Sequence, residues 1–348
     1  MNPFTLLIFA LALFTGTLIT FISSNWLVAW MGLEINTMAI IPIMARNHHP
    51  RATEAATKYF LIQAPAAATI LFVATANAWF TGQWEISQIS EQIPATMILL
   101  ALALKMGLAP THTWLPEVLQ GLDIKTGLLL STWQKLAPFS IVLQLHHANT
   151  PMLIILGTLS ILMGGWAGLN QTQTRKILAY SSITHLGWMM IILRFYPHLT
   201  ILTLIIYLIM TFSIFMVLHQ NNALTINKMS MLSTKLPTIS SLTPLLLLSL
   251  GGLPPLTGFM PKWLILQELS KQGLFALATI IALSALLSLY FYLRLSYAAS
   301  ITMSPNNHLT TTTWRLTKNL MSLPLAASIM LSTTLLPLTP SIAVLLMS

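Results

Sequence analysis

The sequence predicts an all-α membrane protein, a polytopic bundle of about eleven transmembrane helices. Of its 348 residues, 55% are hydrophobic and 7% are charged, with a mean hydropathy of +0.78, whereas a soluble domain carries about 25% charged residues. The chain also contains repeated apolar runs, and a spanning helix needs roughly 20 apolar residues. Polar and basic residues gather between these runs. Together these observations exclude a soluble globular fold.

The apolar runs give the expected spans in order. They are residues 3–21, 25–45, 59–80, 94–121, 126–146, 151–170, 176–194, 199–219, 238–269, 274–297 and 323–346. The first run lacks a basic start and is long enough to span, so it predicts a membrane helix rather than a cleaved signal. The fourth and ninth runs exceed one plain span and contain Gly and Pro. Each is predicted to be a broken helix, which membranes tolerate only where the backbone faces protein or a wet cavity.

Basic residues predict the orientation, because loops on the cytoplasm-like side carry an excess of Lys and Arg. The loops after even-numbered spans hold Arg46, Arg51, Lys125, Arg175, Lys176, Lys228, Lys235, Arg294, Arg315 and Lys318. The opposite loops hold only Arg194 and Lys271. This asymmetry predicts the N-terminus on the basic-rich side and, after an odd number of spans, the C-terminus on the other. The connector 298–322 is either an interfacial helix around Trp314, Arg315 and Lys318 or a plain loop.

An internal repeat relates the two broken helices. "GLAPTHTWLPEVL" at Gly107–Leu119 aligns with "GLPPLTGFMPKWL" at Gly252–Leu264, with Gly, Leu and Pro matched at the start and Glu117 opposite Lys262. The two copies lie five spans apart, and five is odd, so they cross the membrane in opposite directions. Inverted repeats with a broken helix in each half are typical of transporters. We therefore expect a single membrane domain over 1–348, with repeats at 3–146 and 151–297 and a C-terminal helix at 323–346.

Four charged residues fall near the centres of predicted spans: Glu34, Lys105, Lys135 and Lys262. Each charge at a helix centre costs about 2.5–3.5 kcal/mol on insertion scales, so the set costs on the order of 10 kcal/mol, comparable to the stability of a domain. A buried ion pair between Glu34 and one lysine is the structural alternative. One carboxylate does not neutralise three lysines, so the set favours function over scaffolding.

Lysine suits proton transfer, because its charge responds to burial and to a nearby carboxylate, whereas arginine stays charged in either setting. A buried lysine at a changing distance from a glutamate therefore loads and releases a proton, and the helix break beside Lys105 supplies room for water. His185, midway along its span, either relays protons or is a packed, hydrogen-bonded residue. Glu117 is either an access point on the inner side or an interfacial carboxylate.

The sequence excludes several other chemistries. There is no cysteine, so disulfides, thiol metal sites and thiol nucleophiles are absent. The formal net charge of +9 comes from scattered residues rather than a patch, which argues against nucleic acid as a partner. No Gly-rich phosphate loop, dinucleotide fingerprint or nucleophile elbow is present. The histidine pairs His48–His49 and His146–His147 lack a nearby third ligand. We expect no cofactor or metal in this chain and no redox centre.

The whole chain resembles the antiporter-like membrane subunits of respiratory complex I. The resemblance is carried by "MNPFTLLIFALALFTGT" at the start, "WMGLEINTMAIIPIM" around Glu34, "LKMGLAPTHTWLPEVLQG" around Lys105, "STWQKLAPF" around Lys135, "RKILAYSSITHLGWM" around His185 and "GGLPPLTGFMPKW" around Lys262. It implies two inverted five-helix repeats in which Glu34, Lys105, Lys135 and Lys262 carry protons. It also implies a subunit of NADH:ubiquinone oxidoreductase, driven by quinone reduction in neighbouring subunits.

The same resemblance implies the surroundings of the chain. NADH, FMN, iron–sulfur clusters and ubiquinone belong to other subunits. Partners are the other membrane-arm subunits, including neighbouring antiporter-like ones, with accessory subunits and lipid such as cardiolipin. The location is the mitochondrial inner membrane, with the N-terminus in the matrix and the C-terminus in the intermembrane space. Two alternatives stay open at this point: a subunit of a cation/proton antiporter, and a passive assembly scaffold of the membrane arm.

Overall fold

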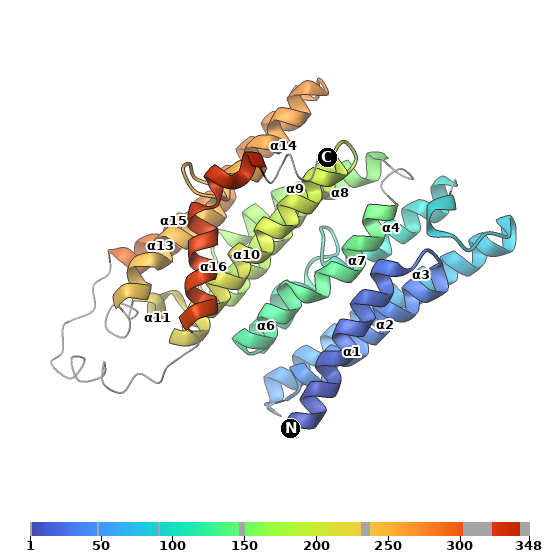
Figure 1. Ribbon diagram of the computed structural model, residues 1–348, viewed down its shortest axis with the longest axis horizontal. Coiled ribbons are helices and arrows are strands. Elements are labelled where there is room, and N and C mark those ends of the chain that lie inside the picture. The colour runs from blue at the N-terminus through green and yellow to red at the C-terminus, as the bar shows by residue number, and fades with distance from the viewer. Residues whose placement is uncertain are drawn as a thin grey trace. The chain divides into compact units, whose positions relative to one another are not determined.

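The computed structural model describes residues 2–46, 49–89, 91–145, 150–230, 237–301 and 322–341. Helices account for all the regular secondary structure among these residues, apart from two isolated β-bridges. The chain forms two compact units, Met1–Ser160 and Ile161–Ser348, drawn in blue to green and in green to red in Figure 1. The all-α class predicted from the composition is confirmed.

The first unit is built from seven helices and the start of an eighth among its described residues. In order they are α1 (Pro3–Ile22), α2 (Trp26–Met44), α3 (Pro50–Thr81), the 3₁₀ turn η1 (Ile86–Gln88), α4 (Gln92–Met106), α5 (Trp114–Gly121), α6 (Ile124–Ser131), α7 (Trp133–Gln144) and the first part of α8 (Thr150–Gly168). Helix α3 packs against α2, α4 and α5, and α7 packs against α1, α2 and α4. The long helices of this unit run side by side (Figure 1).

Two glycines set the close crossing of α1 and α2. A Cβ on Gly16 would lie 2.6 Å from Asn36 Oδ1, and one on Gly32 would lie 2.6 Å from Thr20 Cγ2. Neither side has room for a larger residue without a shift. Small residues let membrane helices approach until their backbones are in contact, so this pair fixes how α2, which carries Glu34, is held in the unit.

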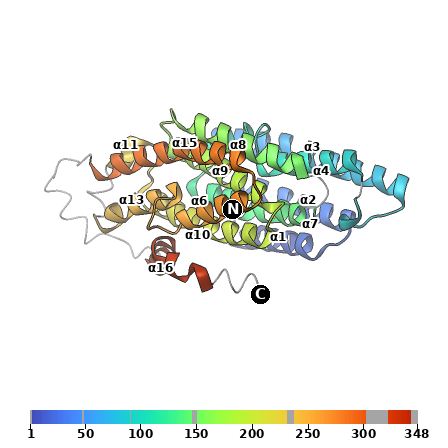
Figure 2. The ribbon, with the colours of Figure 1, turned by 90° about the horizontal axis from the view of Figure 1, so that it is seen from above.

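The second unit continues from α8 through a further set of helices. They are α9 (Thr174–Leu193), α10 (Pro197–Asn221), α11 (Ile226–Ser230), α13 (Pro237–Gly251), α14 (Phe259–Lys271), α15 (Phe275–Ser300), α16 (Ser322–Thr334) and the turn η3 (Leu336–Leu338). A buried cluster including Ile161, Trp188, Ile265 and Ile281 joins α8, α9, α14 and α15. Helix α16 packs on α10 and α13, and Figure 2 shows it in red at the edge of this unit.

Seven helices among the described residues are long and apolar enough to cross a membrane, and α4, most of α13 and most of α16 are shorter apolar helices. Three predicted boundaries differ by three residues or more. Helix α3 begins at Pro50 rather than 59, because residues 50–58, about two and a half turns of more polar sequence, continue the same helix ahead of the apolar run. Helix α15 continues to Ser300, three residues into the predicted connector. Helix α16 ends at Thr334, because Pro337 has no N–H to donate to the carbonyl four residues earlier, that of Thr333.

The predicted fifth span, 126–146, is two helices rather than one, separated at Thr132. The Thr132 hydroxyl and the Ser131 hydroxyl both donate to the Leu128 carbonyl, at 2.7 Å and 3.0 Å. Side-chain bonds of this kind compete with the backbone ladder and bend helices. No Gly or Pro marks the position, which is why the apolar pattern did not reveal it. The interruption lies one turn before Lys135.

Several expectations fall outside the described residues. They concern His48, His146 and His147, the basic loop residue Lys235, the interfacial residues Trp314, Arg315 and Lys318, and the last part of the chain from residue 342.

Candidate functional site

The break in the fourth predicted span separates α4 from α5 at residues 107–113. Gly107 ends α4 with a left-handed backbone, φ +78°, which glycine adopts without steric cost. The N–H groups of Gly107 and Leu108 both donate to the Ala103 carbonyl at 2.9 Å, which closes the helix end. The peptide bond between Ala109 and Pro110 is cis. The predicted break is therefore present, with Lys105 in the last turn of α4.

The break in the ninth predicted span repeats this geometry between α13 and α14. Gly252 has the same φ of +78°, and the N–H of Leu253 donates to the Leu248 carbonyl at 3.2 Å. The peptide bond between Pro254 and Pro255 is cis. Glu117 is the fourth residue of α5 and Lys262 is the fourth residue of α14. The two aligned segments therefore occupy the same local position in their units.

A second local feature also recurs in both units. An isolated antiparallel bridge joins Asn25, before α2, to Glu85, after α3. Its counterpart joins Gln173, before α9, to Thr225, after α10. In each case the first residue of the following helix donates across the bridge: Trp26 N–H to the Trp84 carbonyl at 3.0 Å, and Thr174 N–H to the Leu224 carbonyl at 3.2 Å.

Two side chains donate to carbonyls in the last turn of α4, and one of these carbonyls, that of Leu104, also accepts the Gly107 N–H at 3.2 Å. The indole N–H of Trp114 donates to the Leu104 carbonyl at 3.1 Å, and the Gln63 amide donates to the Lys105 carbonyl at 3.4 Å. Trp114 also meets Tyr59 edge-on, with ring centroids 5.7 Å apart. Protein donors therefore occupy part of the backbone that the break exposes. The sequence had instead predicted room for water at this position.

Glu34 and Lys105 lie in the same unit but not in direct contact. Lys105 is 7% exposed, and its ammonium has no hydrogen-bond partner within the described part of the chain. No ion pair within 4.0 Å joins the two side chains, although their charges lie within electrostatic range. The Glu34 carboxylate instead accepts a bond from the Thr37 hydroxyl at 3.1 Å. A direct pair is thus not formed in this state.

Lys135 is 3% exposed, in the first turn of α7. The neighbouring Gln134 amide donates to the Asn36 carbonyl on α2 at 3.3 Å. Both polar atoms of the Asn36 amide are buried without a hydrogen-bond partner in the described residues. The hydrogen bond from Gln134 therefore joins α7 to α2 at a point close to Lys135 on α7 and close to Glu34 on α2.

In the second unit, His185 lies on α9 at 9% exposure, with its ring centroid 5.5 Å from that of Tyr207 on α10. Ser182, one turn before His185, is hydrogen-bonded to the Tyr207 side chain. Lys262 is half-buried and donates to the Gly251 carbonyl at 2.7 Å, across the break. This lysine therefore caps the end of α13.

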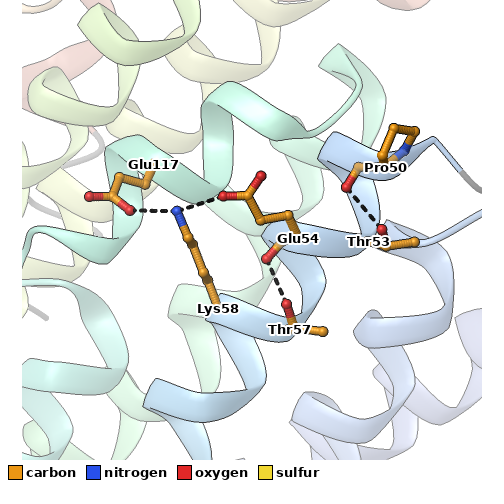
Figure 3. Close-up of polar contacts among 6 residues, drawn as sticks. All are labelled: Pro50, Thr53, Glu54, Thr57, Lys58 and Glu117. Atoms are coloured by element: carbon orange, nitrogen blue, oxygen red, sulfur yellow. Dashed lines mark hydrogen bonds and ion pairs between the residues drawn. The ribbon is translucent and has the colours of Figure 1, made fainter.

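Glu117 lies away from these buried groups. Its side chain is 56% exposed and pairs with Lys58 on α3 at 3.1 Å, and Lys58 also pairs with Glu54 at 2.9 Å. Figure 3 shows the ammonium between the two carboxylates. Glu54 and Lys58 are four residues apart on one helix, a spacing at which side chains meet, whereas the contact between Lys58 and Glu117 joins residues 59 positions apart.

Sequence reasoning also missed Gln63, Asn36 and Trp114. Gln63 and Asn36 are amides inside apolar spans and are each 2% exposed. Burying an amide in a membrane span costs free energy, as burying a lysine does, although the cost is smaller. The two amides in apolar runs were therefore a signal that the sequence offered. Trp114 offered no such signal, because tryptophan is common in apolar segments.

Comparison with known proteins identifies the family. The transmembrane family described as NADH:quinone oxidoreductase/Mrp antiporter matches residues 23–288, and the family described as NADH dehydrogenase subunit 2 C-terminus matches residues 289–343. NADH-ubiquinone oxidoreductase chain 2 of Salmo salar is 61% identical over 347 residues, which cover 99% of each chain. The chain belongs to the NADH-ubiquinone oxidoreductase chain 2 family. It is therefore a subunit of that enzyme, and the resemblance found in the sequence is confirmed.

Solved structures agree with membership of the chain 2 family. A chain of respiratory complex I from Thermus thermophilus with bound aureothin superposes with a TM-score of 0.85 and 26% identity, covering 98% of this chain and 79% of that one. A chain of the Mrp complex from Dietzia sp. DQ12-45-1b gives a TM-score of 0.77 and 16% identity, covering 86% and 61%. The second likeness shows the fold alone. The chain is thus an antiporter-like membrane subunit of a multi-subunit respiratory complex.

Proposed function

We propose that this subunit carries protons through the membrane arm of complex I, with Glu34, Lys105 and Lys135 acting in the first unit and Lys262 in the second. The observation that carries the proposal is Lys105, a lysine buried beside a helix break with no hydrogen-bond partner among the described residues, yet within electrostatic range of Glu34. An inert bundle gains nothing from such a residue, because an unpaired buried charge is destabilising.

The working cycle follows from the separation of the two groups. When Glu34 approaches Lys105, the pair favours the charged ammonium, and when they move apart the buried lysine releases its proton. Redox chemistry on NADH, FMN, iron–sulfur clusters and ubiquinone takes place in other subunits and drives this movement. His185 relays protons in the second unit, and Glu117 gives access from the matrix side.

The two units are, in this proposal, inverted repeats of one ancestral half, covering 3–146 and 151–297. The matching glycine-ended helices and the matching bridges support this. The partners are neighbouring antiporter-like subunits, accessory subunits and lipid such as cardiolipin in the mitochondrial inner membrane, with the N-terminus in the matrix and the C-terminus in the intermembrane space.

Two alternatives are less well supported. A subunit of a cation/proton antiporter shares the fold, but the match to the subunit 2 C-terminal family and the end-to-end identity with chain 2 favour complex I. A passive scaffold would tolerate neutral residues at the buried positions, which can be tested.

The test is Lys105→Met in the assembled complex, with Lys125→Met as the control. Lys125 is an exposed lysine of the same unit. We expect Lys105→Met to leave the complex assembled on a blue-native gel and to suppress coupled NADH oxidation, while Lys125→Met changes neither. Normal coupled turnover in an assembled Lys105→Met complex would favour the scaffold.

A further inference from the structure

The carbonyl groups at the end of α4 need hydrogen-bond donors, as they do at the end of every broken helix. The last carbonyls of a helix have no intrahelical partner and need another donor. At the end of α4 the Ala103 carbonyl is satisfied by the N–H groups of Gly107 and Leu108. The Leu104 carbonyl accepts two bonds, from the Gly107 N–H at 3.2 Å and from the indole N–H of Trp114 at 3.1 Å, and the Lys105 carbonyl accepts the amide of Gln63. Trp114 comes from the far side of the break and Gln63 from the neighbouring helix α3.

At the second break, a lysine side chain is the donor to a helix-end carbonyl. The Lys262 ammonium reaches back across the break and donates to the Gly251 carbonyl, the last of α13, at 2.7 Å. A charged donor makes a stronger bond to a carbonyl than a neutral one does. In the second unit, the lysine ammonium beside the break is therefore held by a helix-end carbonyl.

We infer that Trp114 and Gln63 are positioning residues that occupy the carbonyls at the end of α4 and so keep the Lys105 ammonium from binding to them. The inference rests on the proton-carrying role proposed for Lys105. Its four-carbon stem starts on the residue whose own carbonyl Gln63 occupies, and next to the one that Trp114 occupies. With both carbonyls taken, the ammonium has no protein partner among the described residues and remains responsive to Glu34.

The two donors suit this task because neither carries a charge. Their hydrogen bonds persist whether Lys105 is protonated or neutral. Both are buried, Trp114 at 5% exposure and Gln63 at 2%, and Trp114 is further held by its edge-on contact with Tyr59. Because these two hydrogen bonds do not change, only the distance between Lys105 and Glu34 varies.

The titratable groups around this site are few. Helix α3, packed on α4, carries Arg51, Glu54, Lys58 and Tyr59, of which Arg51 is exposed and Glu54 and Lys58 lie in the exposed ion-pair cluster. Helix α7, also packed on α4, carries Lys135. The break carries His112, and Glu34 acts on Lys105 at longer range. Replacing the two neutral donors removes none of these titratable groups.

The test removes each donor while keeping the side chain apolar and close in size. Trp114→Phe retains a ring against Tyr59, and Gln63→Leu retains the volume of the amide. The matched control is Trp30→Phe, because Trp30 donates its indole N–H to the Ala67 carbonyl on α3 at the same 3.1 Å, away from the break. Each variant is assayed in the assembled complex, in proteoliposomes, for protons translocated per NADH oxidised across a range of pH.

Each substitution opens one acceptor position, on the Leu104 or the Lys105 carbonyl, and this position captures the ammonium and holds its proton. We therefore expect both variants to translocate fewer protons per NADH at neutral pH. Their pH profile should move to the alkaline side by about one unit, the size of effect that one hydrogen bond to a charged group produces. Trp30→Phe should keep the wild-type profile.

The outcomes separate this inference from the proposed function. If Lys105→Met translocates protons normally, the proposed function fails. If Lys105→Met is defective but Gln63→Leu and Trp114→Phe keep the wild-type pH profile, only the present inference is overturned. Should Trp114→Phe fail to assemble, Gln63→Leu alone decides: a shifted profile supports the inference and an unshifted one overturns it.

Discussion

Lys105 and Lys262 lie on opposite sides of their helix breaks along the chain. Lys105 lies in the last turn before its break, and Lys262 lies in the first turn after its own. One ammonium has no protein hydrogen-bond partner among the described residues, and the other donates to a helix-end carbonyl. Two lysines beside the two helix breaks are thus in different states of hydrogen bonding. We take this to mean that the two units handle protons at different steps.

Glu117 gives a prediction at this scale, because it shares Lys58 with Glu54. We expect Glu117→Gln to lower the rate of proton translocation, since the proposal gives Glu117 an access role, while Glu54→Gln leaves that rate unchanged. Both substitutions remove one carboxylate from the same ammonium, so loss of the ion pair itself is controlled. Translocation by assembled complexes in vesicles is the measurement. Equal rates in the two variants would make Glu117 an interfacial residue only.

At the scale of elements, most of the helices followed from apolar runs and from Gly and Pro positions. Both breaks were predicted because Gly107 and Gly252 fall next to prolines inside runs too long for one span. The interruption at Thr132 was not, because hydroxyl groups bonded to a carbonyl leave no mark on hydropathy. For the same reason the donors at the end of α4 escaped notice, since tertiary hydrogen bonds depend on neighbours distant in the sequence.

The glycine that ends α4 can be tested against a glycine of similar backbone. Gly82 ends α3 at φ +74° with nothing within 4 Å of a built Cβ, whereas a Cβ on Gly107 would lie 2.8 Å from Leu115 Cδ1. Alanine in the left-handed region costs about 1–2 kcal/mol. Gly82→Ala should lower the stability by that conformational cost alone. Gly107→Ala should lower it by the same cost and should also displace α5.

Thermal inactivation of the assembled complex measures this difference. We expect the inactivation temperature to fall further for Gly107→Ala than for Gly82→Ala, with a coupled turnover defect only in the former. If the two variants lose stability equally and both keep normal turnover, the close packing at this break is not important for function.

At the scale of the whole molecule, the family, the membrane class and the enzyme were all readable from composition and motifs, while the orientation rests on charge asymmetry alone. The absence of cysteine makes the orientation testable. Lys228 and Lys271 are exposed residues near the ends of helices, and the charge asymmetry predicts them on opposite sides of the membrane. In mitoplasts, an impermeant maleimide should label Lys271→Cys at once and Lys228→Cys only after the membrane is permeabilised, as read by mass analysis of this chain. The reverse pattern would invert the topology.

The central claim, that buried lysines carry protons, is tested most directly by the number of protons translocated per NADH oxidised. The variants are Lys262→Met and Lys271→Met, because both lysines lie on α14 and only the first contacts the break; Lys271 is exposed and paired with Glu268 at 2.6 Å. In assembled complex in proteoliposomes, we predict a lower ratio, or turnover too slow to sustain pumping, for Lys262→Met and the wild-type ratio for Lys271→Met. A wild-type ratio and rate in an assembled Lys262→Met complex would contradict the account.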